Sequence, residues 1–186
     1  LGGLTGGQFV RRGDENETWL VRARIAPPTR RAGWFDTRLF ETEESNILRA
    51  RLTPKDGETI EFARENDNFV LKADLPEGQV ARSSQVERIP RFLATLDFDD
   101  VRPTGKDREA GARLVAETED GVTIELTTLA SEEDDDQTWV SINVRGSGEA
   151  AENLRARSKG FEFALPSYDA QLFGWSLEDL TESAES

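Results

Sequence analysis

The alternation of apolar and polar residues near the start of the chain predicts a β-hairpin. Residues 8–12 and 18–25 each have the pattern of a strand, and the segment from Gly13 to Asn16 between them is rich in turn-forming residues. Two prolines, Pro27 and Pro28, end the second strand. Beyond them, apolar residues at positions 35, 39 and 40 are spaced as on one face of a helix, so we expect a short helix over residues 34–40.

A short internal repeat is the strongest pattern in the chain. Residues 56–62 (DGETIEF) and residues 120–126 (DGVTIEL) are identical at five of seven positions. Each Asp-Gly pair supplies residues that tolerate a positive φ, so each copy predicts the turn and second strand of a hairpin. A chance match built from favourable hairpin residues is the alternative interpretation.

The surroundings of the two copies are also alike. Strand-like segments lie before and after each copy, at 47–52 and 69–71 for the first and at 112–118 and 139–142 for the second. We therefore expect two related antiparallel β-meander units.

A helix is predicted after the first meander, over residues 84–96. Four large aliphatic side chains lie on one face of it, and Ser84 with Glu87 has the spacing of a capping box. Because Pro90 lacks an amide hydrogen, we expect either a kink or a helix that begins at Pro90.

The last third of the chain predicts two more helices and a strand. Residues 148–158 are rich in Ala, Glu and Arg, with Leu154 as the one large apolar residue, which indicates a surface helix. Residues 161–165 alternate like a strand. Ser167 then caps a helix that carries four large apolar residues, and the tail from Glu182 is polar and expected to fray.

These elements predict an α+β fold of two related antiparallel β-meander units with covering helices. We expect the first half, residues 1–98, to hold the hairpin, the short helix and the first meander with its helix. Residues 99–186 hold the second meander and the C-terminal helices, and the halves form one compact unit.

The charge balance argues against nucleic acid as a partner. The 186 residues include 37 acidic and 23 basic ones, a net charge of -14, which repels nucleic acids and anionic membrane faces. The short basic clusters are Arg11-Arg12 and Arg30-Arg31. The acidity itself is accounted for by solubility.

The residue types that most enzymes and metal sites use are missing. The chain has no Cys and no His, which removes thiolate chemistry, the commonest general base and the commonest transition-metal ligand. We therefore expect no enzyme, no metal and no cofactor. No apolar run approaches the ~20 residues of a membrane span, and the abrupt start at Leu1 suggests a piece excised from a longer protein.

Acidic clusters offer two candidate sites. The run Glu132–Asp136 supplies carboxylates of the kind that bind Ca²⁺, but it lacks the ligand spacing of a calcium loop and is interpreted as a solvated loop. Asp99-Asp100 is the first pair to consider for a carboxylate-only hydrolase, although neighbours on a strand point to opposite faces.

Three further candidates are weak on sequence alone. Ser158-Lys159 are adjacent without a catalytic spacing, and the other lysines are at positions 55, 72 and 106. The segment Gly2–Gly7 lacks the ending of a phosphate-binding loop and is interpreted as a linker. Among Trp19, Trp34, Trp139 and Trp175, core packing is expected for most; Trp34, after a Pro-rich turn and next to Gly33, is expected to be partly exposed.

Several stretches together resemble a bacterial family, domain of unknown function 4340. The stretches are Gly7–Arg12 with Thr18–Leu20, Trp34–Asp36 leading into Ile47–Leu52, Phe92–Leu96 with Asp99–Val101, and Gly160–Tyr168 with Leu177–Leu180. Each motif is common alone, whereas their order and spacing along nearly the whole chain are moderately specific.

The resemblance implies a domain on the periplasmic side of the inner membrane, in a parent chain anchored by an N-terminal membrane helix. It also implies genes that neighbour those of a gliding-motility-type ABC transporter. The family has no established activity, so it supplies no catalytic residues. We accordingly expect a non-catalytic binding module whose partners are membrane transporter subunits or other envelope proteins. The alternatives are a solute- or glycan-binding domain and a carboxylate-only hydrolase.

Overall fold

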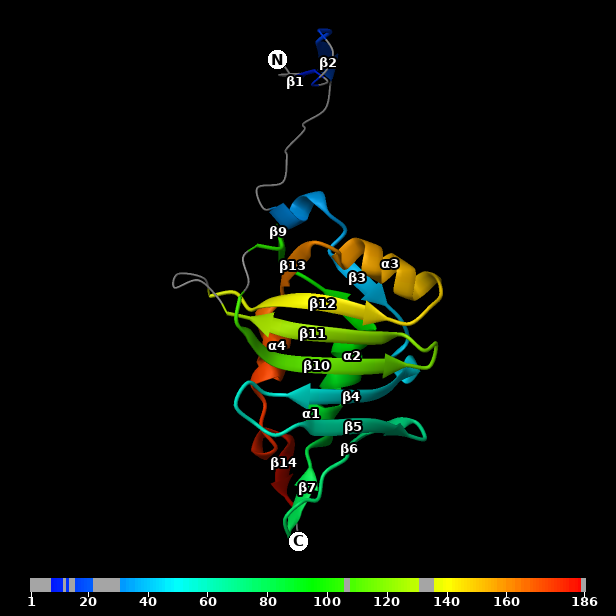
Figure 1. Ribbon diagram of the computed structural model, residues 1–186, viewed down its shortest axis with the longest axis vertical. Coiled ribbons are helices and arrows are strands. Elements are labelled where there is room, and N and C mark those ends of the chain that lie inside the picture. The colour runs from blue at the N-terminus through cyan, green and yellow to red at the C-terminus, as the bar shows by residue number, and fades with distance from the viewer. Residues whose placement is uncertain are drawn as a thin grey trace, which may run out of the picture.

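Eight strands form one antiparallel sheet, in the order β6-β5-β4-β10-β11-β12-β13-β9 (Figure 1). Buried and exposed residues alternate along its longer strands. The computed structural model describes residues 8–11, 13, 16–21, 31–105, 108–130 and 136–184. The strands are β1 Gln8–Val10, β2 Trp19–Val21, β3 Arg38–Glu41, β4 Ile47–Thr53, β5 Ile60–Glu65, β6 Asn68–Leu71, β7 Gln79–Ala81, β8 Thr95–Asp97, β9 Asp100–Pro103, β10 Ala110–Thr118, β11 Thr123–Leu129, β12 Trp139–Arg145, β13 Phe161–Ala164 and β14 Thr181–Ser183. The helices are α1 Ser83–Val86, α2 Arg88–Ala94, α3 Glu149–Ser158 and α4 Ser167–Ala170, with 3-10 turns η1 Arg31–Trp34, η2 Glu44–Asn46, η3 Gln171–Gly174 and η4 Glu178–Leu180.

The two predicted meanders are confirmed and are joined edge to edge. Strands β4-β5-β6 form the first and β10-β11-β12 the second, and β4 pairs with β10 in the middle of the sheet. The repeat has the same role in both: Ile60 and Ile124 are buried on the core face, whereas Glu61 and Glu125 lie on the opposite face. The α+β class is therefore as expected, and the division at residues 98 and 99 stays a prediction.

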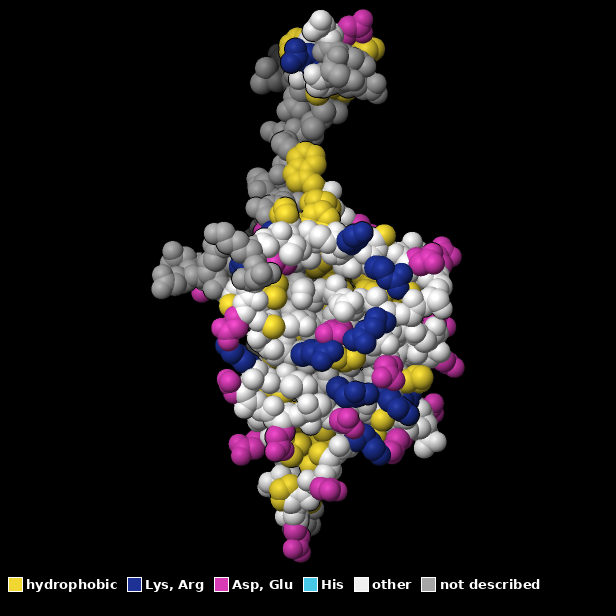
Figure 2. Space-filling model, in the orientation of Figure 1, with side chains coloured by type: hydrophobic (Ala, Val, Ile, Leu, Met, Phe, Trp, Pro, Cys, Tyr) yellow, Lys and Arg dark blue, Asp and Glu magenta, His cyan; other side chains and the backbone are white. Residues whose placement is uncertain are grey.

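One face of the sheet carries the core and the other is open. Helices α1, α2 and α4 lie behind the sheet in Figure 1, and α3 packs against β12 and β3. On the open face, charged side chains pair across neighbouring strands (Figure 2). The ion pairs are Lys72–Glu65, Arg51–Glu61, Arg51–Glu117, Arg113–Glu125 and Arg145–Glu125.

The predicted hairpin at the start of the chain is confirmed in its described part, where β1 and β2 pair antiparallel. The predicted short helix over residues 34–40 is wrong. Only η1, which ends at Trp34, is helical, and β3 follows it and pairs with β8. The Asp36 carboxylate accepts a hydrogen bond from the amide of Arg38 at 3.2 Å, which favours a turn there.

The helix predicted over residues 84–96 is two short helices, α1 and α2, followed by β8. Pro90 falls in the first turn of α2, where its missing amide hydrogen costs nothing, so α2 begins at Arg88 rather than at Pro90. The capping box is wrong, because α1 begins after Arg82 without a side-chain cap.

The C-terminal segment is also more broken than expected. Ser167 opens the short helix α4 without capping it, and η3 and η4 follow in place of one long helix. The tail does not fray at Glu182, because β14 pairs with β7 there. The predicted helix at 148–158 and strand at 161–165 are confirmed as α3 and β13.

The two Asp-Gly turns differ in backbone conformation. Gly121 has a positive φ of 75°, as the turn chemistry predicts, whereas Gly57 is not among the residues with positive φ. The first connection, from Pro54 to Thr59, is longer than the second, from Glu119 to Val122. Gly57 therefore does not have to adopt the positive φ that a tight turn requires.

Candidate functional site

An aromatic groove lies between five elements at the β9–β13 end of the sheet. Its hollow has a volume of about 430 Å³. These elements are η1 with the turn after it, β3, β9 with the β8–β9 connection, α3 and β13. The groove is lined by Trp34, Phe35, Asp36, Leu39, Phe98, Val101, Ala156, Arg157, Phe161 and Phe163. We call this hollow the aromatic groove.

The rim of the aromatic groove is apolar and exposed, which is unusual for large aromatic side chains. Trp34 is 67% exposed, Phe35 49% and Phe161 37%. The floor is ordinary core: Phe98 and Phe163 are buried with their ring centroids 5.1 Å apart. The prediction that Trp34 is partly exposed is therefore confirmed.

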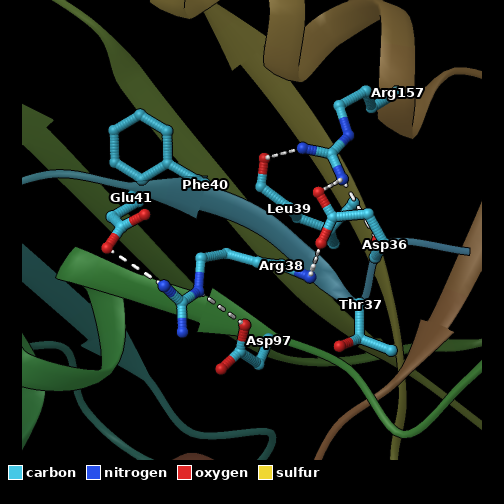
Figure 3. Close-up of a pocket in the computed structure, with 8 residues that line it drawn as sticks. All are labelled: Asp36, Thr37, Arg38, Leu39, Phe40, Glu41, Asp97 and Arg157. Carbon is cyan, nitrogen blue, oxygen red and sulfur yellow. Dashed lines mark hydrogen bonds and ion pairs between the residues drawn. The ribbon is translucent and has the colours of Figure 1, made fainter.

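The polar end of the groove is organised by Arg157. Figure 3 shows its side chain reaching from α3 to the edge of β3. Its Nη2 lies 3.3 Å from Oδ2 of Asp36 and donates to the carbonyl oxygen of Asp36 at 3.1 Å, while Nη1 donates to the carbonyl oxygen of Leu39 at 3.4 Å. Because these bonds hold one carbonyl oxygen in the turn before β3 and one within β3, Arg157 fixes the position of the strand that forms one wall.

A second guanidinium extends this polar end beyond β3. Arg38 donates from Nη1 to Glu41 at 3.0 Å and from Nε to Asp97 at 3.4 Å (Figure 3). The hydrogen bond to Glu41 raises the pKa of the Arg38 guanidinium above its ordinary value. The three carboxylates here, those of Asp36, Glu41 and Asp97, are thus each paired with a guanidinium.

This arrangement suits binding better than catalysis. An acid–base pair needs two carboxylates in contrasting environments, one of them poised to hold a proton. Here each of the three carboxylates is ion-paired with a guanidinium, so no two of them lie in contrasting environments. The exposed aromatic rim offers a large apolar contact area, and the ion pairs offer fixed polar contacts beside it.

A larger hollow of about 650 Å³ lies at the other end of the sheet, between the Pro54–Thr59 turn, Lys72–Asp74 and Phe173–Leu177. Both of its lysines face acids: Lys55 lies 3.0 Å from Glu109 and Lys72 2.6 Å from Glu65. The hydrogen bond with Glu109 raises the pKa of Lys55, whereas a lysine general base needs a lowered pKa.

The two candidate pairs from the sequence lie elsewhere in the structure. Asp99 is exposed and precedes β9, while the Asp100 carboxylate accepts a hydrogen bond from the Val101 amide at 2.8 Å. The buried Ser158 hydroxyl donates to the carbonyl oxygen of Arg155 within its own helix, and Lys159 is exposed. Neither pair lines the aromatic groove.

Other sequence candidates fall partly outside the described residues. These are the segment Gly2–Gly7, residue 106 and residues 132–135 of the acidic run, of which only Asp136 is described, and it is exposed. Among the tryptophans, Trp139 and Trp175 are buried and Trp19, like Trp34, is exposed.

Sequence reasoning missed most of the groove. Phe161 and Arg157 carried no distinguishing signal, since one alternates within a strand and the other lies on a charged helix. Trp34 alone stood out, through the glycine before it and the prolines upstream.

No group of three or more acidic side chains within the described part of the chain is arranged to hold a metal ion. Each helix formed by the described residues is too short or too polar to cross a lipid bilayer.

Comparison with known proteins identifies a family but no relative of known role. No curated protein and no solved structure matches the chain. The sequence profile of one family, described as Domain of unknown function (DUF4340), matches residues 1–114. This range includes the hairpin, the first meander and six of the ten residues that line the groove. The chain therefore belongs to the DUF4340 family.

Proposed function

We propose that this chain is a non-catalytic binding module that contacts a protein partner through the aromatic groove. The observation that carries the proposal is the gathering of Trp34, Phe35 and Phe161, all solvent-exposed, around one hollow. Aromatic residues are enriched at the energetic centres of protein interfaces because they bury much apolar area at small conformational cost.

The setting of the proposal is a membrane transport system. We place the module on the periplasmic side of the inner membrane, in a parent chain anchored by an N-terminal membrane helix. Its partners are transporter subunits or other envelope proteins. The resemblance described above supports this setting, and the acidic surface and the paired carboxylates of the groove support a role without nucleic acid and without catalysis.

The test is affinity purification of the full-length parent from its native host, with the bound proteins identified. The wild type is compared with Trp34→Ala/Phe35→Ala and with Trp19→Ala, which removes another exposed indole, outside the groove. We expect transporter subunits with the wild type and with Trp19→Ala, and their loss with the double variant. Retention by the double variant would contradict the role of the groove.

A solute- or glycan-binding domain is the second candidate. The observation that favours it is the placement of an arginine–aspartate pair, Arg157 and Asp36, beside exposed rings, since pockets for polar solutes combine apolar walls with a few fixed polar groups. Calorimetric titration with cell-wall oligosaccharides tests it, and binding that Trp34→Ala abolishes would favour this candidate over a protein partner.

A further inference from the structure

Two tryptophans of the chain occupy the same kind of local structure. Gly33-Trp34 and Gly174-Trp175 each lie at the end of a 3-10 turn, and each is followed by a leucine and a glutamate at the same spacing, at positions 39 and 41 and at 180 and 182. The strands β1 and β2 precede η1, whereas β13 and then α4 precede η3. After η1 comes the short strand β3, which pairs with β8. After η3 and η4 comes the short strand β14, which pairs with β7.

The two indoles nevertheless differ sharply in exposure. Trp175 is 8% exposed, whereas Trp34 is 67% exposed. Trp175 is covered by Arg88 of α2, whose guanidinium carbon lies 4.8 Å from the centre of the Trp175 ring and 3.7 Å from that of Tyr168. Hydrogen bonds to Gln85 and to the carbonyl oxygen of Tyr168 hold this guanidinium in place.

Trp34 has no such cover within the described residues. Arg157, which shares the groove with it, is turned toward the carbonyl oxygens of β3 and the carboxylate of Asp36 (Figure 3). A cation over an indole face is attracted by the ring, most strongly when both are removed from water. Among the described residues, the cation that covers Trp175 therefore has no counterpart over Trp34.

The charge around Trp34 favours a positively charged group of a binding partner. Within the groove, the carboxylate of Asp36 is 75% exposed even though it is paired with Arg157. An exposed carboxylate accepts further hydrogen bonds on the oxygens that its present partner leaves open. The net charge of -14 adds a long-range attraction for a cationic segment.

We propose that the partner's contact segment is a helix that lays an arginine over Trp34, as α2 lays Arg88 over Trp175. The segment belongs to a polypeptide other than the parent chain. That a second polypeptide binds at the groove rests on the proposed function. The arginine stacks on the indole and reaches Asp36, while apolar residues of the same helix cover Phe35 and Phe161.

Substitutions at position 34 separate a cation–π contact from plain apolar contact. We expect Trp34→Phe, which keeps an aromatic face, to weaken association of the full-length parent with its transporter partner by less than about threefold. Trp34→Leu keeps an apolar side chain without the face and should weaken association about tenfold. Trp19→Leu is the matched control, and equal effects of the Phe and Leu variants would overturn the stacked arginine.

Photo-crosslinking then identifies the segment. p-Benzoylphenylalanine is placed at position 34 of the full-length parent in its native host, and the crosslinked peptide is sequenced. We expect an arginine-bearing helical segment of a second polypeptide. A crosslink confined to the parent chain, a crosslinked segment without arginine, or no crosslink at all overturns the inference.

The two proposals fail in distinguishable ways. Copurification of transporter subunits that survives Trp34→Leu leaves the binding module in place and removes this inference. Absence of any transporter or envelope subunit from the wild-type preparation removes both.

Discussion

Arg102 and Glu162 face each other across β9 and β13, with Nε of Arg102 2.7 Å from Oε2 of Glu162. The Glu162 side chain is only 4% exposed, and the amide of Gly105 and the guanidinium of Arg108 also approach it. The Arg102 guanidinium carbon lies 3.8 Å from the centre of the Trp139 ring. A buried ion pair therefore ties the edge strand β9 to the rest of the sheet.

Glu162→Ala should lower the free energy of unfolding by about 3 kcal/mol, because it removes the carboxylate that a buried guanidinium faces. Urea denaturation at neutral pH measures the change. The matched control is Glu61→Ala, which breaks the exposed pair with Arg51 on the open face and should cost less than about 0.5 kcal/mol. Equal costs at the two positions would show that burial does not set the strength of the β9 contact.

Glu125 should make stability depend on pH in the acid range. It lies between Arg113 at 2.7 Å and Arg145 at 2.8 Å, and the hydrogen bond from Arg113, more than any other contact, lowers the pKa of Glu125 below its ordinary 4.5. The stabilisation is thus complete above pH 4.5 and is lost as the pH falls toward the lowered pKa of the folded protein. Glu125→Gln should flatten this part of the profile, and denaturation series between neutral and acid pH test it.

Asp169, unlike Glu125, should lower the stability of the folded protein at neutral pH. Burial raises the pKa of its carboxyl group, although Arg88 opposes the rise, so the ionised form is disfavoured in the folded protein. The resulting cost is present at pH values above the raised pKa and is relieved as the carboxyl group takes up a proton. Asp169→Asn should therefore raise the unfolding free energy at neutral pH by less than about 1 kcal/mol. A decrease at neutral pH would contradict the assignment.

Gly146, after β12, should not tolerate a side chain. Its φ is +112°, and a Cβ there would lie 2.5 Å from the carbonyl oxygen of Gly121 in the turn between β10 and β11. Gly146→Ala should cost about 3 kcal/mol or more, since backbone strain and a backbone clash add. Gly148→Ala is the control: its φ of +97° is also positive, but a Cβ there meets nothing within 4 Å, so only the backbone strain of about 2 kcal/mol is expected. Thermal unfolding of both variants measures the difference.

The parts of the fold that sequence predicts are those fixed by neighbours along the chain. The Asp120-Gly121 turn and the alternation on both sides of it set the second meander locally, and the first copy follows the same pattern. Predictions failed where the secondary structure of a segment is determined by contacts with residues far away along the chain. Leu39 and Phe40 fit a helix face, but pairing with β8, as in Phe40 opposite Leu96, makes this segment a strand.

The aromatic groove could not be derived for the same reason. Its walls come from segments as far apart as Trp34 and Phe163, and only the assembled sheet brings them together. Trp34 stands out in the sequence because a glycine precedes it and two prolines lie upstream. Arg157 acquires its role only by reaching backbone oxygens of β3, which no spacing within α3 reveals.

The ion pairs on the open face of the sheet have an electrical consequence for the whole molecule. The four basic residues in these pairs, Lys72, Arg51, Arg113 and Arg145, are matched by four acidic ones, Glu65, Glu61, Glu117 and Glu125. The pairs sum to zero, so the net charge of -14 arises from the remaining residues. The charge of the molecule is therefore unevenly distributed. A cationic partner that diffuses toward it is steered to surfaces that carry the net negative charge rather than to the neutralised pairs.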